Sequence, residues 1–207
     1  NADIVSCNYY IYRVDHVIST HTMSVQYDKR TLTGMDILRY YLLKTEPFDL
    51  NVVWNKIFKL DLFNGVVPVR FPKGRVQEDN FTIFMLFLNA NSIVTVNEPL
   101  YYYVQRAGSI MATFTRRFMI DTIESHIYMS DYLMNHCSSV KNELQLYLLN
   151  SYVELSRIVC ANKCKKEYND LLIQYKHYVL DHTADTSHNP MWKCKQYIKR
   201  LLVKLYY

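Results

Sequence analysis

Two adjacent carboxylates, Glu78 and Asp79, stand between a loop-like segment and an apolar run. The segment 66–76 before them holds two Pro and one Gly, which is typical of a loop. Adjacent carboxylates repel each other, so one of them gains basicity and is suited to removing a proton from a reacting group. The same pair also suits the first turn of a helix, where the macrodipole favours negative charge. The residues alone leave both roles open.

The elements that must position this pair are of mixed type. Stretches rich in β-branched and aromatic residues predict strands that pair as a hairpin, over 3–12 and 16–26. Apolar residues at helical spacing predict helices over 31–44, 50–64 and 78–89. The first of these helices has Thr31 or Thr33 as its N-cap. A strand over 92–105, interrupted at Pro99, follows the third.

The second half of the chain shows almost only helical periodicity. Four helices are predicted from residue 115 onward, separated near Cys137, near Asn162 and by the polar stretch 181–190. The predicted fold class is therefore α/β, or α+β within this chain, followed by an all-helical tail. We place the boundary between the two domains at 112, giving 1–112 and 113–207.

The composition is that of a globular protein, with 207 residues of which 50% are hydrophobic and 21% charged. Five widely spread cysteines argue against a secreted disulfide framework and predict a reducing, cytoplasmic location. No apolar run reaches the roughly 18 residues that a membrane helix needs. The formal charge of +5 is modest.

Three stretches carry a family resemblance by their order and spacing: Val-Trp-Asn-Lys-Ile-Phe at 53–58, Arg-Phe-Pro-Lys-Gly-Arg-Val-Gln-Glu-Asp at 70–79, and Pro-Leu-Tyr-Tyr-Tyr-Val-Gln-Arg-Ala-Gly-Ser-Ile at 99–110. They resemble consecutive motifs of bacterial family 2 glycosyltransferases. The resemblance runs from Ala2 to about Ile110 and does not reach the helical tail.

The resemblance implies an A-type nucleotide-sugar fold of which this chain is the C-terminal, acceptor-side part. In that fold the preceding half binds the donor and presents an Asp-x-Asp-like metal motif, and no such motif occurs here. Divalent metal (Mn or Mg) ligands are thus expected mostly outside this chain, with none within it, and the chain alone is expected to be inactive. The implied activity is inverting transfer of a sugar from a nucleotide-diphospho-sugar to a glycan or lipid-linked acceptor in bacterial surface polysaccharide synthesis.

Family motifs also imply roles for individual residues. Asp79 matches the catalytic base of the family's Glu-Asp motif, with Glu78 as its orienting neighbour. Arg106 and Ser109 lie where a closing loop touches a diphosphate, although many family members carry a His about here that this chain lacks. An ordinary turn with a solvated Arg is the other interpretation.

Trp54 and Lys56 are candidates for the acceptor side of the site. The reason is that an indole face packs well on a sugar ring. A core Trp with a surface Lys explains the same pair equally well.

A zinc-finger spacing occurs in the tail but lacks the context of a finger. Cys160, Cys164, His177 and His182 have the spacing of such a site, yet both cysteines fall in a helical pattern where a finger requires a hairpin. Nucleic-acid binding is also disfavoured, because the basic residues do not follow the aromatic strands.

The end of the chain predicts a basic amphipathic helix. Its apolar residues fall at i, i+3, i+4 and i+7, namely Ile198, Leu201, Leu202 and Leu205, with Lys and Arg on other faces. Such a helix over 190–207 can lie on an anionic membrane surface, here the inner membrane face, or pack on its own domain. A non-catalytic helical module that binds a membrane or a partner is accordingly the alternative function.

Overall fold

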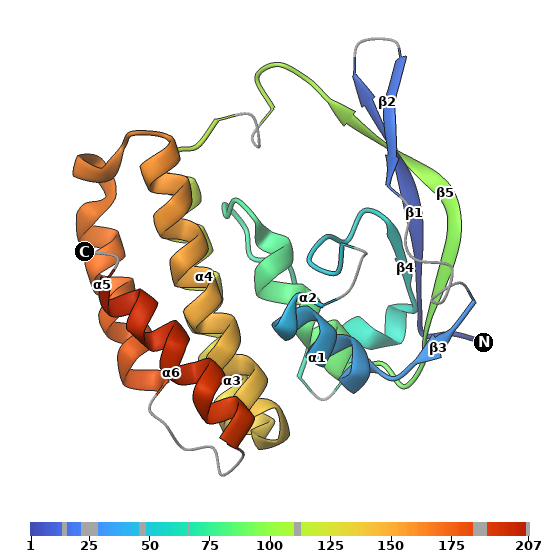
Figure 1. Cartoon of the computed structure of the whole chain (residues 1–207). Coiled ribbons are helices and arrows are strands. Elements are labelled where there is room, and N and C mark those ends of the chain that lie inside the picture. The colour runs from blue at the N-terminus through green and yellow to red at the C-terminus, as the bar shows by residue number, and fades with distance from the viewer. Residues whose placement is uncertain are drawn as a thin grey trace. The chain divides into compact units, whose positions relative to one another are not determined.

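The structure is a computed structural model that describes residues 1–13, 16–21, 29–45, 49–65, 67–109, 113–183 and 190–205, with side chains left undescribed at 16–21, 190–196 and 205. The chain divides into two compact units, Asn1–Phe118 and Met119–Tyr207. The first unit is built on a sheet and the second on helices (Figure 1). This mixture of strands and helices is the predicted class at its coarsest level, while the A-type fold stays a prediction.

The sheet of the first unit has five strands in the described residues, in the order β2-β1-β5-β3, with β4 paired to β1. Its strands are β1 (Ile4–Arg13), β2 (His16–His21), β3 (Thr31–Leu32), β4 (Lys56–Phe58) and β5 (Ile93–Gln105). The central pair, β1 and β5, is parallel, and β2 and β4 run antiparallel to β1 at its two ends. The predicted hairpin of β1 with β2 is confirmed as far as His21, and residues 22–26 of the predicted second strand lie outside the described residues.

Pro99 does not interrupt β5, contrary to the prediction. It pairs with Asn8 at a point where the register between β1 and β5 shifts. Asn8 is buried, and its side-chain amide donates to the Asn97 carbonyl oxygen at 2.7 Å. An irregular register accommodates a residue without a backbone N–H, so the strand continues through the proline.

Two helices, α1 (Gly34–Leu43) and α2 (Glu78–Asn89), lie on the same side of the sheet in Figure 1. Thr33 is the N-cap of α1, and a reciprocal capping box joins it to Asp36. The helix ends at Lys44 in the left-handed conformation. These two helices pack closely at Gly34, whose N–H donates to the Ala90 carbonyl oxygen at 3.3 Å.

The helix predicted over 50–64 is wrong. The structure has β4 at Lys56–Phe58 and a short 3₁₀ helix, η2, at Leu60–Phe63. The helical spacing of apolar residues was misleading because Ile57 and Leu60 are 75% and 73% exposed. Pairing of β4 with β1 supplies the backbone partners that a helix would otherwise provide.

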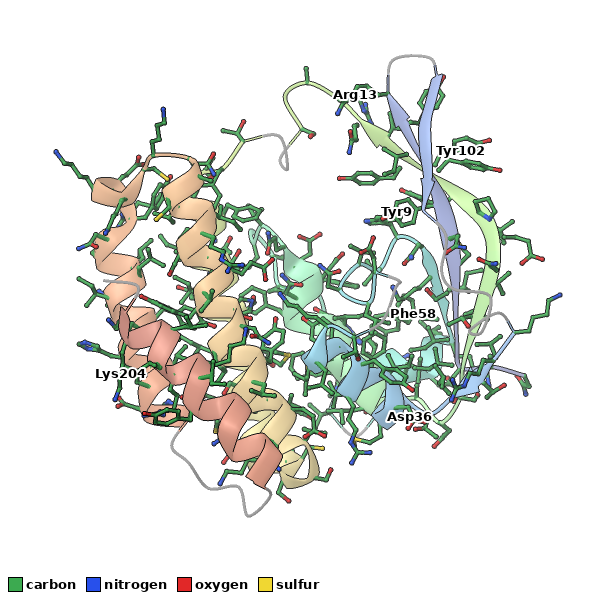
Figure 2. All side chains as sticks on the ribbon, in the orientation of Figure 1. Tyr9, Arg13, Asp36, Phe58, Tyr102 and Lys204 are labelled. Carbon is green, nitrogen blue, oxygen red and sulfur yellow. The ribbon has the colours of Figure 1, made fainter. Side chains whose placement is uncertain are left out.

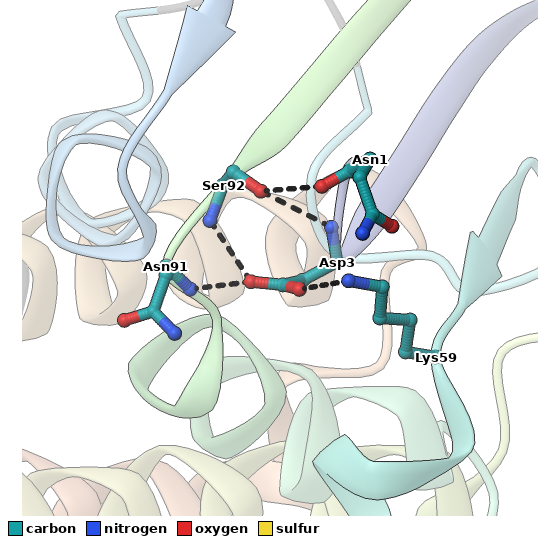
Figure 3. Close-up of polar contacts among 5 residues, drawn as sticks. All are labelled: Asn1, Asp3, Lys59, Asn91 and Ser92. Carbon is teal, nitrogen blue, oxygen red and sulfur yellow. Dashed lines mark hydrogen bonds and ion pairs between the residues drawn. The ribbon is translucent and has the colours of Figure 1, made fainter.

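Asp3 fastens the start of β1 to the start of β5 (Figure 3). Its carboxylate accepts from the Lys59 ammonium at 2.8 Å and from the backbone N–H groups of Asn91 and Ser92 at 2.9 and 3.1 Å. The hydrogen bond from Lys59 and those from the two backbone groups lower the pKa of Asp3, outweighing burial. Segments nearly ninety positions apart in the sequence are thus held by one charged side chain.

The second unit contains the helices predicted for the tail: α3 (Arg116–His136), which begins just before it, α4 (Lys141–Ala161), α5 (Lys165–His182) and α6 (Pro190–Leu205). Its core includes polar groups with partners. His126 Nδ1 lies 3.0 Å from the Tyr175 hydroxyl, and both residues are buried. The four helices and their separations are confirmed.

Candidate active site

Asp79 lies in the first turn of α2 but does not serve as a local cap. The N-cap of α2, Gln77, is in the left-handed conformation and makes no side-chain cap hydrogen bond. Oδ2 of Asp79 instead accepts from the backbone N–H of Val53 at 3.2 Å, from a loop 26 residues upstream. This is the hydrogen bond that the described part of the chain gives the Asp79 carboxylate. Its other carboxylate oxygen, Oδ1, accepts no hydrogen bond from the described residues.

The surroundings of Asp79 increase its basicity. Burial raises the pKa of its carboxyl, and the negative charge of Glu78 adds to the rise. The Val53 N–H and the Lys56 ammonium act in the opposite direction, but the net pKa is above the ordinary value for Asp. The predicted repulsion between the two acids is therefore present, with burial as the larger cause.

Lys56 holds together the loop that contacts Asp79. Its ammonium donates to the carbonyl oxygens of Asp49 and Val52, at 2.8 and 2.6 Å, and to Oδ1 of Asn55 at 2.8 Å. These three bonds use all the donors of an ammonium group. Burial lowers the pKa of Lys56 to about 7, opposed by the charges of Asp49 and Asp79. Lys56 thus supports the site from within the loop, and a direct contact with substrate stays a prediction.

Trp54 follows Val53 directly and belongs to an aromatic cluster, which consists of Tyr9, Trp54, Tyr101 and Tyr103. The indole is nearly parallel to the rings of Tyr101 and Tyr103, with centroids 4.8 and 5.0 Å away. Tyr9 meets it edge-on at 4.7 Å. Trp54 is half-buried and Tyr101 is 37% exposed, so part of the cluster is accessible to a ligand.

The loop is also joined to β1 through Tyr9 and Asn55. The Tyr9 hydroxyl donates to the carboxylate of Asp49. Asn55 is buried, and its amide donates to the Cys7 carbonyl oxygen at 3.1 Å. Figure 2 shows Tyr9 and Tyr102 on opposite sides of the sheet, so alternate tyrosines of the strands serve different faces. Strands β1 and β5 therefore fix the position of the loop that meets Asp79.

Arg106 and Ser109 lie apart from this loop in the described contacts. They are exposed at the end of β5, in a turn closed by the Ser109 N–H donating to the Arg106 carbonyl oxygen at 3.3 Å. Gly108 supplies the positive φ of 79° that the turn requires. The structure thus places Trp54 next to Val53, whose N–H binds Asp79, and Lys56 close enough for its charge to act on Asp79, while the Arg106 and Ser109 side chains are exposed. Their contact with a diphosphate stays a prediction.

Several residues of the site were not predicted from the sequence. They are the Val53 backbone N–H, Asp49, Asn55, Tyr9, Tyr101 and Tyr103. The alternation of Tyr101 and Tyr103 along a strand was the available signal, because residues two apart share a face. The backbone N–H of Val53 could not be predicted in this way, because a backbone donor does not depend on the residue type.

The described residues contain neither a cluster of metal ligands nor a membrane-spanning helix. Among these residues no group of three His, Cys, Asp or Glu side chains is placed to hold a metal ion. Nor does any helix within the described ranges have the length and apolarity required to cross a membrane.

Comparison with known proteins gives two partial similarities, and no protein-family model matches the chain. The sequence is 24% identical over 149 residues to Glycosyltransferase GlyA of Streptococcus pneumoniae, covering 70% of this chain and 21% of that protein. It is 43% identical over 58 residues to Glycosyltransferase GlyG of the same organism, covering 28% of this chain and 18% of that protein. The chain therefore spans about a fifth of the length of these curated relatives. The first match covers more of the chain than either compact unit contains, so the similarity reaches into both units.

Proposed function

We propose that this chain is the acceptor-side part of an inverting family 2 glycosyltransferase, in which Asp79 is the catalytic base. The observation that carries the proposal is the Asp79 carboxylate, which accepts a hydrogen bond from the Val53 N–H and whose pKa is raised by burial. The similarity to parts of two streptococcal glycosyltransferases supports the same class of reaction. The donor is a nucleotide-diphospho-sugar and the acceptor a glycan or lipid-linked glycan of a bacterial surface polysaccharide.

In the proposed reaction the acceptor hydroxyl oxygen attacks the anomeric carbon of the donor. Asp79 takes the hydroxyl proton as the new glycosidic bond forms. The bond from the anomeric carbon to the diphosphate breaks, and its electron pair leaves with the nucleoside diphosphate. A base whose pKa lies above that of an ordinary Asp accepts this proton more readily. Glu78 contributes through its charge, which is one cause of the raised pKa.

The aromatic cluster supports an acceptor that contains a sugar. Trp54 is adjacent in sequence to Val53, so its indole is positioned by the loop that also binds Asp79. Aromatic faces pack on the C–H groups of a pyranose, and tyrosine hydroxyls provide hydrogen bonds beside them. Lys56 acts as a positioning residue because its ammonium is bonded to three atoms of this loop.

A divalent metal, Mn or Mg, is proposed for the complete enzyme, where it would neutralise the leaving diphosphate. The described residues of this chain provide no three-residue ligand group for it. We therefore assign the donor and the metal ligands mostly to protein outside these 207 residues and assign this chain's residues to the acceptor and the proton.

The test is donor turnover by the product of the complete gene with a panel of nucleotide sugars and Mn or Mg. Asp79→Asn should lower kcat by roughly 10²- to 10⁴-fold, the usual contribution of a general base, while donor binding persists. Asp61→Asn is the matched control, because Asp61 is an exposed Asp at the start of η2. Near-normal turnover by Asp79→Asn would refute the assignment of the base.

A further inference from the structure

Three large apolar side chains are exposed in the described part of α6. Tyr197, Ile198 and Leu201 are 70%, 51% and 44% exposed, whereas Val203 is fully buried. Residues three or four apart share a helix face, so these three side chains form one strip, which we term the α6 strip. The exposed strip differs from the predicted apolar stripe. The prediction included Leu202, which is half-buried, and omitted Tyr197, which is exposed.

Polar contacts hold α6 in the orientation that exposes this strip. The Arg200 guanidinium donates to the Leu180 carbonyl oxygen and to Oγ1 of Thr183, both at 2.9 Å. A cation at the end of α5 is also favoured by the dipole of that helix. The Lys176 ammonium donates to the Lys204 carbonyl oxygen at 3.4 Å, close to the other end of α6. Turning the strip inward would break these bonds and expose Val203.

The charge of α6 indicates what the strip contacts. The helix carries five basic residues and no acidic one, namely Lys193, Lys195, Lys199, Arg200 and Lys204. Lys204 is exposed near the end of α6 (Figure 2). Positions 197, 201 and 204 are spaced by four and three residues, so Lys204 shares a helix face with Tyr197 and Leu201. Lysines flanking an apolar strip can extend to lipid headgroups while the aliphatic side chains enter the acyl boundary.

We propose that the α6 strip docks on an anionic membrane surface, with α6 lying in the plane of the interface. Ile198 and Leu201 enter the acyl boundary, Tyr197 remains at headgroup level, and the lysines contact anionic headgroups. This role is separate from the proposed sugar transfer, since it uses no residue of the loop around Asp79. It adds attachment at the surface to a chain whose described helices do not span a bilayer.

The experiment is flotation of the whole 207-residue chain with vesicles of phosphatidylcholine alone or mixed with phosphatidylglycerol. The test variant is Ile198→Asp with Leu201→Asp. The matched control is Ile57→Asp with Leu60→Asp, which changes an Ile and a Leu of equal or greater exposure in the first unit. Circular dichroism verifies that both variants keep their helices.

We expect the unmodified chain to float with the mixed vesicles. The test variant should bind them roughly tenfold or more weakly, because its aliphatic side chains no longer enter the lipid. The control should float like the unmodified chain. Added salt and Lys204→Glu should both weaken binding, because the headgroup contacts are electrostatic. Equal flotation on both kinds of vesicle, or none, overturns the proposal. Self-association that the test variant removes, without vesicle binding, overturns it in favour of an interface between two copies.

Discussion

At the scale of single residues, the buried carboxylate of Asp79 lowers stability at neutral pH. Its folded pKa is raised, so the folded state binds a proton more readily than the unfolded state does. Stability is then lost as the pH rises through the interval between the ordinary and the raised pKa. A neutral side chain that keeps the Val53 hydrogen bond avoids this loss.

Asp79→Asn should consequently increase the free energy of unfolding at neutral pH. The gain should shrink as the pH falls below the ordinary pKa of Asp, because the wild-type carboxyl is then neutral in both states. Urea titrations of the wild type and the variant across this pH range provide the measurement. A variant that is less stable at neutral pH would contradict the raised pKa.

Lys56→Met should destabilise the loop beneath Trp54. The substitution leaves the acceptors on Asp49, Val52 and Asn55 without their donor. The free energy of unfolding should fall by about 1–3 kcal/mol, the cost of leaving a buried polar group unsatisfied. Equilibrium unfolding in urea measures the loss. Lys73→Met is the control, since Lys73 is exposed in the loop before α2. Equal effects of the two changes would show that Lys56 does not hold the loop.

Residue types predicted part of this site and not the rest. The sequence indicates an acidic pair at a helix start and a Trp upstream, and in the structure Asp79 of α2 accepts a hydrogen bond from Val53, which directly precedes Trp54. The sequence could not indicate that the Lys56 ammonium turns inward, because its acceptors are mainly backbone carbonyls, which do not depend on residue type. The exposed turn at Arg106 has no described contact with the loop that holds Trp54. The order of the motifs along the chain did not predict this separation.

At the scale of secondary structure, α1 and α2 approach each other at Gly34. A Cβ placed on Gly34 would lie 1.8 Å from the Phe87 carbonyl oxygen and 2.6 Å from that of Ala90. Both atoms belong to the backbone, so no side chain can move aside. The small residue at this position therefore determines how closely the two helices pack.

Gly34→Ala should lower stability by about 1–3 kcal/mol or more, as expected when an overpacked contact forces backbone apart. Thermal unfolding followed by circular dichroism measures the change. Gly65→Ala is a matched control, because its Cβ would meet only the Asn89 side-chain nitrogen, at 3.8 Å. Unchanged stability in Gly34→Ala would mean that α1 and α2 can separate at little cost.

The contribution to stability of Asp3, which joins the start of β1 to the start of β5, should depend on pH. The pKa of Asp3 is lowered in the folded state, so its contribution is present above the ordinary pKa of Asp and is lost as the pH falls through the folded value. Asp3→Asn should thus be less stable than the wild type near neutrality and approach it in acid. Unfolding curves of the wild type and of Asp3→Asn at several pH values test this.

Elements with strong local signals were predictable, and those formed by distant pairing were not. The hairpin of β1 and β2, α2 and the four helices of the tail follow from periodicity and capping residues. The two-residue strand β3 and the strand β4 exist because β5 and β1 provide hydrogen-bond partners. Helical spacing over 50–64 failed for the same reason, since tertiary pairing outweighed a weak local preference.

At the scale of the whole molecule, the two compact units contribute differently to the proposed enzyme. The residues assigned to the acceptor and the proton belong to Asn1–Phe118, and the α6 strip belongs to Met119–Tyr207. The similarity to GlyA is longer than either unit. At least part of the helical unit therefore lies within the region that is similar to that protein.

The 207-residue chain alone should transfer no sugar. The proposed assignment places the donor-binding part, with its Asp-x-Asp-like metal motif, outside these residues. Release of nucleoside diphosphate from a panel of nucleotide sugars, with Mn or Mg and glycan acceptors, is the measurement. Turnover by the chain alone, abolished in Asp79→Asn, would show that the donor site is contained within it.

The parallel pairing of β1 with β5 also has a consequence for how the chain is synthesised. Ile4 pairs with Ile93, so β1 leaves the ribosome long before its central partner exists. At usual translation rates the interval is about 5–20 seconds, far longer than local hairpins need to form. During that time β2 and then β4 can pair with one edge of β1 while its other edge stays open. Nascent chains are consequently most exposed to misassociation through this tyrosine-rich strand until β5 is made.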